Sequence, residues 1–449
     1  MKNKYDVAVI GSGPAGFSAA VRAAQLGACV AVIEKSEIGG TCLNRGCIPT
    51  KFFWQALKTK QKIQKSYEYG FKAVLEPFSF ADITVKKDKT VSNIRKGMEM
   101  ILSSYSIDII KGEASFENPN VIKAGDKEIF ADKIIISSGT IPASLKGFVF
   151  DGEKIISSTD VLDLKEIPGS ILIVGGGVIG VEMAAILAGF GSRVTLAECA
   201  ERLIPLEDSE ISSEITKNLQ RQGVEVLTSC FNALEIAGKY EKVLIVTGRA
   251  SNCGGMFLEK TGVKTNAKGF IETNEFCQTS VENIYAAGDI AGKNLLAFTA
   301  QNEGAIAAEN SVLGNKQSLN NEIIPSAVFS IPPAASVKVK DYDNCKNIVF
   351  GKFPYTASGR AFIENERSGF IKCAVDKESK KPLGFWIVGA NADEIINAAA
   401  QILKSGAKSL NRETFFHPSL GEGLFNAYED AFGKNTEKAG RRGSGGRGN

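Results

Sequence analysis

Two cysteines lie five positions apart in the glycine-rich stretch GGTCLNRGCIPTK, residues 39–51. Such a pair could act as a redox dithiol, which closes to a disulfide and reopens by thiol exchange. On a regular helix, residues five apart have Cα atoms more than about 7 Å apart, whereas a disulfide needs roughly 4.4–6.8 Å. We therefore expect the backbone to leave helical geometry between Cys42 and Cys47, which Gly46 permits.

Two other interpretations of this pair remain open. A zinc site needs more than two ligands, and no further cysteine or histidine lies nearby in the sequence, so we expect no metal. Inert core cysteines would be unusual among glycines. The other seven cysteines are isolated along the chain, and we interpret them as small buried hydrophobic side chains: Cys29, Cys199, Cys230, Cys253, Cys277, Cys345 and Cys373.

Thiol exchange also needs a base that works near neutral pH. The chain has one histidine, His417 in FFHPSLGE. Glu422 follows five positions later and could orient the imidazole and support its charged form. Because a lone histidine more often has a structural role, the catalytic and the structural interpretation both remain open.

One pattern occurs twice, at residues 4–35 and 169–199. Each copy has an apolar strand, a G-x-G-x-x-G turn, an alanine-containing helix pattern and a second apolar strand followed by an acid. In both copies the acid follows the first glycine by 23 positions. The residues concerned are Gly11, Gly13, Gly16 and Glu34 in the first copy, and Gly175, Gly177, Gly180 and Glu198 in the second.

This pattern is typical of a dinucleotide site. The first glycine makes a tight turn, the second lets the backbone approach a pyrophosphate, and the third lets the helix pack on the sheet. A single copy could be a turn without a ligand, but two copies at equal spacing predict two bound dinucleotides. Since an acid disfavours a 2′-phosphate, Glu198 favours NAD over NADP, although Arg193 and Arg202 lie nearby.

Weaker signals follow along the chain. TSVENIYAAGDIAG, residues 279–292, predicts a short strand that places Asp289 at a ribityl or phosphate group, and residues 131–142 predict a strand before a Ser-Gly-Thr turn. Beyond residue 322, three apolar runs predict an antiparallel sheet, and residues 392–406 predict an amphipathic helix that stops at Gly406.

Composition excludes several classes of protein. A chain of 449 residues with 44% hydrophobic side chains predicts about three domains with sizeable cores. The charges nearly balance at a net +3, so we expect no nucleic-acid or membrane partner. The apolar run 171–190 contains Glu182 and several glycines, which favours a strand, a turn and a helix over a membrane span. Because the start of the sequence shows no signal-peptide pattern, we expect a soluble cytoplasmic protein.

These motifs resemble those of the FAD-dependent pyridine nucleotide–disulfide oxidoreductases, most closely dihydrolipoamide dehydrogenases. The likeness runs from about residue 4 to 431 and is carried by GGTCLNRGCIPTK and by the His-Pro-x-x-x-Glu pattern in HPSLGE. It implies an α/β fold with two Rossmann-like dinucleotide-binding domains and a C-terminal α+β dimerisation domain. The implied domains are 1–144 and 269–320 for FAD, 145–268 for NAD, 321–432 for the interface, and a disordered tail, 433–449.

The resemblance also implies roles for individual residues. Cys42 would be the interchange thiol and Cys47 the thiol closer to the flavin, with His417 and Glu422 supplied by the other subunit of a homodimer. Lys51 and Glu182 would form an ion pair beside the flavin. FAD contacts would come from Gly11, Gly13, Gly16, Glu34, Thr41, Lys51, Gly112, Asp289 and Ala297. NAD contacts would come from Gly175, Gly177, Gly180, Glu198 and Gly248.

The implied activity is oxidation of dihydrolipoamide on the lipoyl domains of 2-oxoacid dehydrogenase or glycine cleavage complexes. Three segments depart from the family pattern: Phe298 replaces a usual histidine, residues 329–334 read FSIPPA, and Lys-Pro-Asn is missing after Arg249. The alternatives are another NAD(P)H-dependent disulfide reductase, of glutathione or mercuric type, and a structural or regulatory flavoprotein. Mercuric-type enzymes usually carry a vicinal cysteine pair near the C-terminus, which this sequence lacks.

Overall fold

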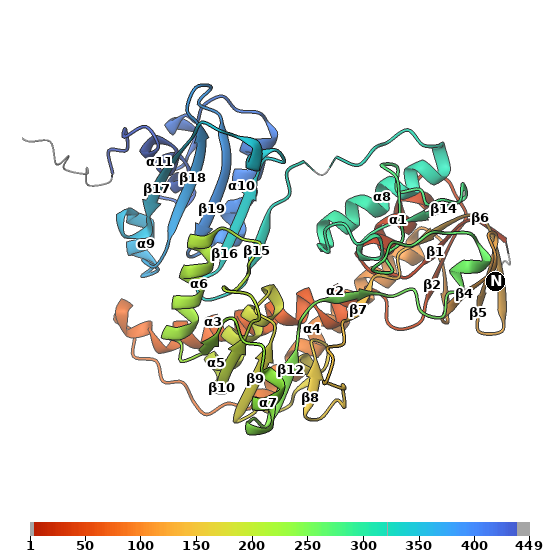
Figure 1. Ribbon diagram of the computed structural model, residues 1–449, viewed down its shortest axis with the longest axis horizontal. Helices are drawn as coiled ribbons and strands as arrows, with labels where there is room; N and C mark the ends of the chain where they lie inside the picture. The colour runs from red at the N-terminus through yellow and green to blue at the C-terminus, as the bar shows by residue number, and fades with distance from the viewer. Residues whose placement is uncertain (1–3, 321, 438–449) are drawn as a thin grey trace, which may run out of the picture. The chain divides into compact units, whose positions relative to one another are not determined.

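The computed structural model describes residues 4–320 and 322–437 (Figure 1). The chain divides into two compact units. The first unit consists of Met1–Thr59, Glu76–Ile167 and Lys242–Asn320, and the second of Lys60–Leu75, Pro168–Glu241 and Asn321–Asn449. Each unit draws on distant parts of the sequence, so the residues of a site can be far apart along the chain.

The first unit is built on a seven-stranded sheet in the order β3-β2-β1-β6-β5-β4, with β14 also paired to β6. The pairs β1–β2, β1–β6, β2–β3 and β6–β14 are parallel. The strands are β1 Lys4–Ile10, β2 Val30–Glu34, β3 Asp108–Lys111, β4 Ala114–Asn118, β5 Val121–Ala124, β6 Lys127–Ile136 and β14 Ile284–Ala286.

Both faces of this sheet are covered, which explains why its central strands are almost continuously apolar. Along β1, Tyr5 and Ala8 join one buried cluster, while Val7 and Val9 join the other. The second cluster is closed by helices α1, Pro14–Gln25, and α8, Ala297–Leu313, which pack side by side (Figure 1). The first unit also contains α2 Gly40–Arg45, α4 Phe80–Ser104, β7 Thr140–Pro142, β8 Ile155–Ser157, β12 Lys242–Ile245 and β13 Arg249–Ser251.

The second unit contains two layered parts. Parallel strands β9 Ser170–Val174, β10 Arg193–Ala197 and β11 Glu225–Leu227 lie in the order β11-β10-β9. Their helices are α5 Val178–Phe190 and α6 Ser209–Arg221, and a short helix, α7 Ala233–Ile236, follows β11. This part repeats the strand–turn–helix–strand arrangement of β1, α1 and β2, as both copies of the pattern predict.

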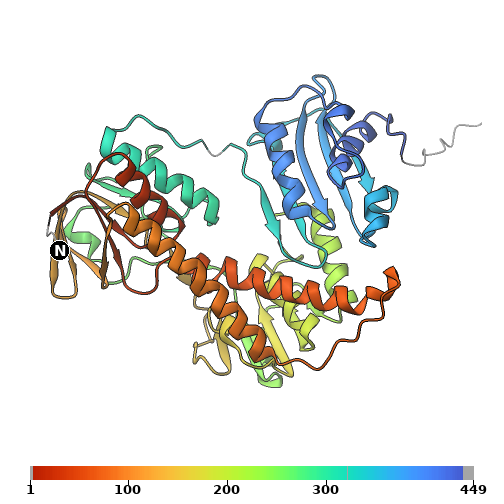
Figure 2. The same cartoon turned by 180° about the vertical axis from the view of Figure 1, so that it is seen from behind.

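The other part of the second unit is a five-stranded antiparallel sheet in the order β15-β16-β19-β18-β17. Helices α10 Ala392–Lys404 and α11 Glu422–Asp430 pack on one face, where they share a core with the strands (Figure 2). The strands are β15 Ser326–Val328, β16 Ala334–Lys338, β17 Ile348–Pro354, β18 Phe370–Asp376 and β19 Pro382–Val388, and a short helix α9 spans Gly359–Ile363. The predicted antiparallel sheet and amphipathic helix are therefore confirmed.

The apolar run at 171–190 forms β9, a glycine turn and α5, as predicted. Across the described part of the chain, no helix is long and apolar enough to span a membrane. Within the predicted tail, Glu437 accepts hydrogen bonds from Arg412 and Asn426. The rest of that tail, 438–449, lies outside the described residues.

Candidate functional site

The two close cysteines lie on either side of a break between two helices. Helix α2 ends at Arg45, and α3, Cys47–Gln64, begins two positions later. Gly46 separates them with φ −155° and ψ −112°, far from helical values. A Cβ on Gly46 would lie 2.9 Å from the backbone oxygen of Thr41, which no ordinary side chain tolerates. The predicted departure from helical geometry is confirmed.

Cys42 and Cys47 are both half-buried in the structure. A hydrogen bond between the two thiols, helped by burial, raises the pKa of Cys42, while the charge of Lys51 acts in the opposite direction. Cys47 is the first residue of α3. Two sulfur atoms within hydrogen-bonding reach of each other need only a small rotation to form a disulfide. The arrangement can therefore perform thiol–disulfide exchange.

The first glycine fingerprint joins β1 to α1 in a turn that requires glycine. Gly11 has a φ of +95°, and a Cβ there would lie 2.6 Å from the carbonyl oxygen of Ser137. A Cβ on Gly16 would collide with the carbonyl oxygen of Gly11. Gly13 has only one neighbouring atom near its Cβ position, at 3.9 Å. Helix α1 begins after Gly13 with no side-chain cap, so its first N–H groups are available to a phosphate.

Glu34 ends β2 beside this turn and is held by the fingerprint itself. Its Oε2 accepts hydrogen bonds from the backbone nitrogen and the hydroxyl of Ser12, at 2.9 and 2.7 Å. Its Oε1 accepts a third bond from the Ser36 amide. The amide of Gly112 donates to the Glu34 carbonyl oxygen, which places Gly112 next to the acid. Ser12 could not be predicted from the motif, because the residue between the first two glycines can be of any type.

Several features of the first unit fit an FAD molecule. The Ser138 hydroxyl is buried without a hydrogen-bond partner beside Gly11, where a ligand could supply one. Asp289 accepts a hydrogen bond from Thr140 at 3.2 Å, and burial raises the pKa of its carboxyl. Ala297 begins α8, where its amide is one of the free N–H groups of a helix start. A neighbouring buried acid on α8, Glu303, accepts from the Gly288 amide.

The second fingerprint repeats this construction in the second unit. Gly175 has a φ of +115°, and a Cβ on Gly180 would collide with the Gly175 carbonyl oxygen. No atom lies within 4 Å of the Cβ position of Gly177, so the approach to the start of α5 is open. Glu198 follows β10 and accepts hydrogen bonds from the amides of Gly176, at 2.5 Å, and Ala200, at 2.8 Å.

Both acids thus bind the amide of the middle residue in their own G-x-G turn. Burial alone would raise the pKa of Glu198, but the hydrogen bonds from Ala200 and Gly176 outweigh it and lower that pKa. A carboxylate held in place beside an open helix N-terminus suits the ribose and pyrophosphate of a dinucleotide. The residues of the second fingerprint therefore fit NAD.

Three further predicted residues lie apart from these clusters. Thr41 is an exposed residue of α2, and Gly248 lies between β12 and β13 with a φ of +145°. Glu182 is buried in α5, where its Oε1 accepts a hydrogen bond from the Phe329 amide. That bond connects α5 to FSIPPA, one of the segments that depart from the family pattern. The ion pair between Lys51 and Glu182 stays a prediction.

His417 and Glu422 lie together in the second unit. Nδ1 of His417 is 2.9 Å from Oε2 of Glu422, and the Glu422 side chain is mostly buried at the start of α11. The amide of Ser419 donates to the other carboxylate oxygen, at 3.3 Å. The imidazole side chain is 73% exposed, so a second molecule can reach the ring. A histidine held in this way can accept or donate a proton at Nε2.

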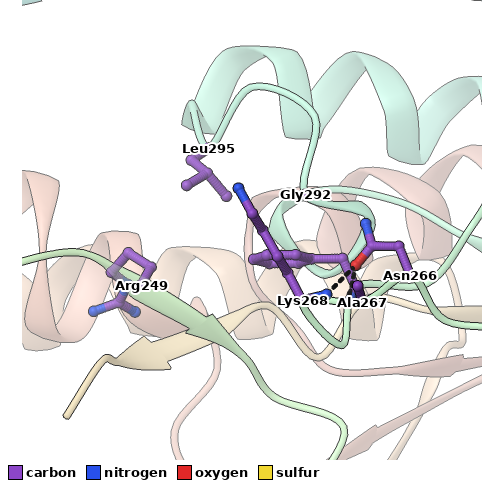
Figure 3. A pocket seen from close by; sticks show the side chains of 7 residues that line it. Arg249, Asn266, Ala267, Lys268, Gly292 and Leu295 are labelled. Atoms are coloured by element: carbon purple, nitrogen blue, oxygen red, sulfur yellow. Dashed lines mark hydrogen bonds between the residues drawn. The ribbon is translucent and has the colours of Figure 1, made fainter.

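A cavity of about 570 Å³ opens in the first unit beside Arg249 (Figure 3). Arg249 donates to the hydroxyl and the carbonyl of Thr140, which in turn binds Asp289. Asn266 closes a tight turn on the opposite side by accepting from the Lys268 amide. This cavity could not be predicted from the sequence, because Arg249 and Lys268 come to line it only through folding. Its lining residues are Arg249, Asn266, Ala267, Lys268, Phe270, Gly292 and Leu295.

The interpretation of the isolated cysteines is only partly correct. Cys277 and Cys373 are buried, as predicted. Cys199 is exposed, which contradicts the prediction, because the chain leaves the sheet immediately after Glu198. Between residues 4 and 437, with 321 excepted, no three His, Cys, Asp or Glu side chains group as metal ligands would.

Comparison with known proteins adds a family match. The sequence pattern described as pyridine nucleotide-disulphide oxidoreductase matches residues 5–304, and its dimerisation domain matches residues 324–428. The chain is 36% identical to a dihydrolipoyl dehydrogenase of Thermus scotoductus, over 95% of this chain and 97% of that protein. It is also 36% identical to a dihydrolipoyl dehydrogenase of Geobacillus stearothermophilus, over 95% and 96%.

Solved structures share the fold. The HOCl-induced flavoprotein disulfide reductase RclA from Escherichia coli matches with a TM-score of 0.83 and 27% identity, over 95% of this chain and 99% of that one. LpdA from Mycobacterium tuberculosis matches with a TM-score of 0.84 over the same shares, at 22% identity, which shows the fold alone. The predicted fold, with a C-terminal dimerisation domain, is therefore confirmed.

Proposed function

Because the chain belongs to the pyridine nucleotide–disulphide oxidoreductase family, we propose that it oxidises protein-bound dihydrolipoamide to lipoamide with NAD+ as the acceptor. The observation that carries this proposal is the helix break at Gly46, which brings the thiols of Cys42 and Cys47 into hydrogen-bonding reach. Relatives named dihydrolipoyl dehydrogenase, 32–36% identical over nearly the whole chain, support the choice of substrate.

FAD and NAD are the cofactors of this family, which agrees with the two fingerprints. We assign FAD to the first fingerprint and NAD to the second. Ser138, with its unpaired hydroxyl, and the open approach to Gly13 support the first assignment. Bound FAD would supply the two-electron chemistry that links a dithiol to a nicotinamide, and the chain supplies position and electrostatics.

Proton transfer is assigned to His417. Its Nε2 would take the proton of a substrate thiol, and Glu422 would hold the ring through Nδ1 and stabilise its charged form. The resulting substrate thiolate would attack Cys42 and open the Cys42–Cys47 disulfide. The second substrate thiol would then displace Cys42, which releases the cyclic disulfide and leaves both cysteines reduced.

The dimerisation domain supports a homodimer. The resemblance to the family implies that His417 of one subunit acts on the cysteines of the other, so we propose that each complete site needs two copies of the chain. Lys51 and Glu182 would flank the flavin in that assembly. Lipoyl domains of 2-oxoacid dehydrogenase or glycine cleavage complexes would be the protein partners that deliver the dithiol.

Preference for NAD over NADP rests on Glu198 and on the positions of two arginines. Arg193 is the first residue of β10, and Glu198 follows the last one. Since the strand is extended, the Cα atoms of Arg193 and Glu198 lie about 16 Å apart. Arg202 donates to the carbonyl oxygens of Pro205 and Glu207. Neither guanidinium is placed to replace Glu198 at a 2′-phosphate, which supports NAD.

The test is a steady-state assay of the purified protein. We expect rapid reduction of NAD+ by dihydrolipoamide and much slower reaction with NADP+. We expect only slow oxidation of NADH when glutathione disulfide or a metal salt is the acceptor. A protein that reduces glutathione disulfide faster than it oxidises dihydrolipoamide would instead be a general disulfide reductase. The likeness to the disulfide reductase RclA, at 27% identity, makes that the second candidate.

A further inference from the structure

Two cysteines outside the catalytic pair lie next to each other where β10 and β11 end. The Glu198 amide donates to the Leu227 carbonyl oxygen at 2.8 Å, and the Cys230 amide donates to the Glu198 carbonyl oxygen at 2.9 Å. That carbonyl belongs to the peptide group that leads into Cys199. Standard peptide geometry then limits the Cα–Cα separation of Cys199 and Cys230 to about 7 Å. A disulfide spans roughly 4.4–6.8 Å, so a small approach of the two backbones at most would let the pair close.

Both thiols can meet a small molecule. Cys199 is exposed and Cys230 is half-buried, and both are free thiols in the structure. The Cys230 sulfur lies 3.4 Å from the side-chain oxygen of Asn232. A second backbone hydrogen bond, from the Ser229 amide to the Ala200 carbonyl oxygen, also joins the segment after β10 to the segment after β11. The backbone therefore already holds the two cysteines together in the reduced protein.

Cys199 also contacts the acid that we assign to NAD. Its Sγ donates to Oε1 of Glu198 at 3.3 Å, and Oε1 accepts as well from the Ala200 amide. This hydrogen bond, with burial and the carboxylate charge, raises the pKa of Cys199. Cys199 thus stays protonated and supplies one of the donors that fix the Glu198 carboxylate.

We propose that Cys199 and Cys230 form a second, regulatory thiol pair that closes to a disulfide and weakens NAD binding at Glu198. The assignment of NAD to Glu198 rests on the proposed function, whereas the disulfide itself does not. The oxidant is a low-molecular-weight disulfide. The Cys230 thiolate attacks it and releases one thiolate. Cys199 then loses its proton and attacks the Cys230 sulfur of the mixed disulfide, which releases the second thiolate, and that thiolate takes up a proton. Two protein thiols are oxidised, and one small disulfide is reduced to two thiols.

Closure changes the NAD site because the Cys199 sulfur must turn away from Glu198 toward Cys230. Oε1 then loses its S–H donor, and a cross-link occupies the side of the carboxylate beside β11. With one donor fewer, the Glu198 carboxylate is less firmly fixed in the position that accepts a hydrogen bond from a ribose hydroxyl. We expect the dissociation constant of NADH to rise about threefold to tenfold, in keeping with the loss of one hydrogen-bonded arrangement.

The disulfide can be detected without any activity measurement. Trypsin places Cys199 in the peptide 194–202 and Cys230 in the peptide 222–239, with one cysteine in each. The holoenzyme is incubated in a series of glutathione and glutathione disulfide buffers, alkylated and digested. We expect a cross-linked 194–202/222–239 species that disappears in Cys230→Ser and persists in the control Cys345→Ser. The catalytic pair gives its own cross-link, 36–45 to 46–51, as an internal positive control.

Binding of NADH to the oxidised and the reduced holoenzyme is then measured by calorimetry. A rise in the dissociation constant that Cys230→Ser abolishes supports the proposal. Cys230→Ser leaves the Cys199–Glu198 hydrogen bond in place, so under both conditions it should bind NADH within about twofold of the reduced parent protein. If the catalytic cross-link forms and the 194–202/222–239 species does not, the pair is no redox site. If that species forms and NADH binding is unchanged, the regulatory role is wrong, whatever substrate the enzyme oxidises.

Discussion

The Nδ1 atom of His417 lies 2.9 Å from the Oε2 atom of Glu422, and the two side chains differ sharply in exposure. The carboxylate is 11% exposed and the imidazole 73% exposed. A mostly buried acid therefore holds one ring nitrogen of a mostly exposed imidazole. This arrangement suits a base that serves another molecule, which supports the role proposed for His417.

We expect Glu422→Gln to keep the hydrogen bond to His417 but to lose the negative charge. The turnover of dihydrolipoamide with NAD+ should fall about 10- to 100-fold, as when other orienting carboxylates are replaced. His417→Gln removes the base itself and should lower turnover about 100- to 10,000-fold. Both variants should keep the long-wavelength thiolate–flavin absorbance on dithiol reduction, whereas Cys47→Ser should abolish it.

Glu429→Gln on the same helix serves as the control and should keep nearly full turnover. Equal losses in Glu429→Gln and Glu422→Gln would mean that α11 is merely sensitive to charge. The assignment of His417 as the base would then have no kinetic support.

Replacement of Gly46 by alanine should disturb the catalytic thiols. An added Cβ would lie 2.9 Å from the Thr41 backbone oxygen, so the turn between α2 and α3 must shift. We expect the free energy of unfolding to fall by about 1–3 kcal/mol. The Cys42–Cys47 disulfide should also form more slowly, as measured by thiol alkylation after oxidation.

Gly97 provides a matched control in the interior of α4, where no atom lies within 4 Å of its Cβ position. Gly97→Ala should raise the free energy of unfolding by about 0.5–1 kcal/mol, because glycine is a poor helix former. A stabilised Gly46→Ala protein with normal oxidation would refute the role given to the helix break.

Local patterns predicted the strand, glycine turn and helix of each fingerprint correctly. Gly11 and Gly16 follow from the backbone requirements of one short turn, so the motif carries the information by itself. The helix break at Gly46 follows in the same way from the geometry of five-residue spacing. By contrast, Ser138 and Cys230 gain their surroundings only from strand pairing. Cys230 lies 31 positions after Cys199, and nothing in the sequence between them indicates that β10 and β11 end at the same place.

Alanine substitutions at the second and third glycines of the second fingerprint, Gly177 and Gly180, should have different effects. A Cβ on Gly180 would collide with the Gly175 carbonyl oxygen, so Gly180→Ala should destabilise the fold by about 1–3 kcal/mol. No atom lies within 4 Å of the Cβ position of Gly177. The free energy of unfolding of Gly177→Ala should therefore lie within about 0.5 kcal/mol of that of the parent protein.

The same Gly177→Ala variant should bind NADH at least about tenfold more weakly, because the added methyl group occupies space in front of the α5 N-terminus. Urea unfolding and calorimetry on both variants distinguish the two effects. Unchanged NADH affinity in Gly177→Ala would place the dinucleotide elsewhere.

The buried carboxylate of Glu198 should make the protein less stable in acid. Its pKa is lowered from the ordinary value of 4.5, because the hydrogen bonds from the Ala200 and Gly176 amides outweigh the effect of burial. A group with a depressed pKa in the folded state stabilises that state at pH values above its unfolded pKa. The contribution is lost as the pH falls below 4.5 and through the lower, folded pKa. Glu198→Gln should therefore lose less stability between pH 6 and about pH 3 than the parent protein does.

Urea midpoints measured across that pH range test this expectation, with Glu201→Gln as the control for removing a nearby acid. The control should follow the parent curve, since Glu201 is an exposed residue. A Glu198→Gln curve parallel to the parent curve would mean that the ionised carboxylate adds nothing to folding. Its hydrogen bonds to the glycine turn would then serve only to position the acid for the dinucleotide.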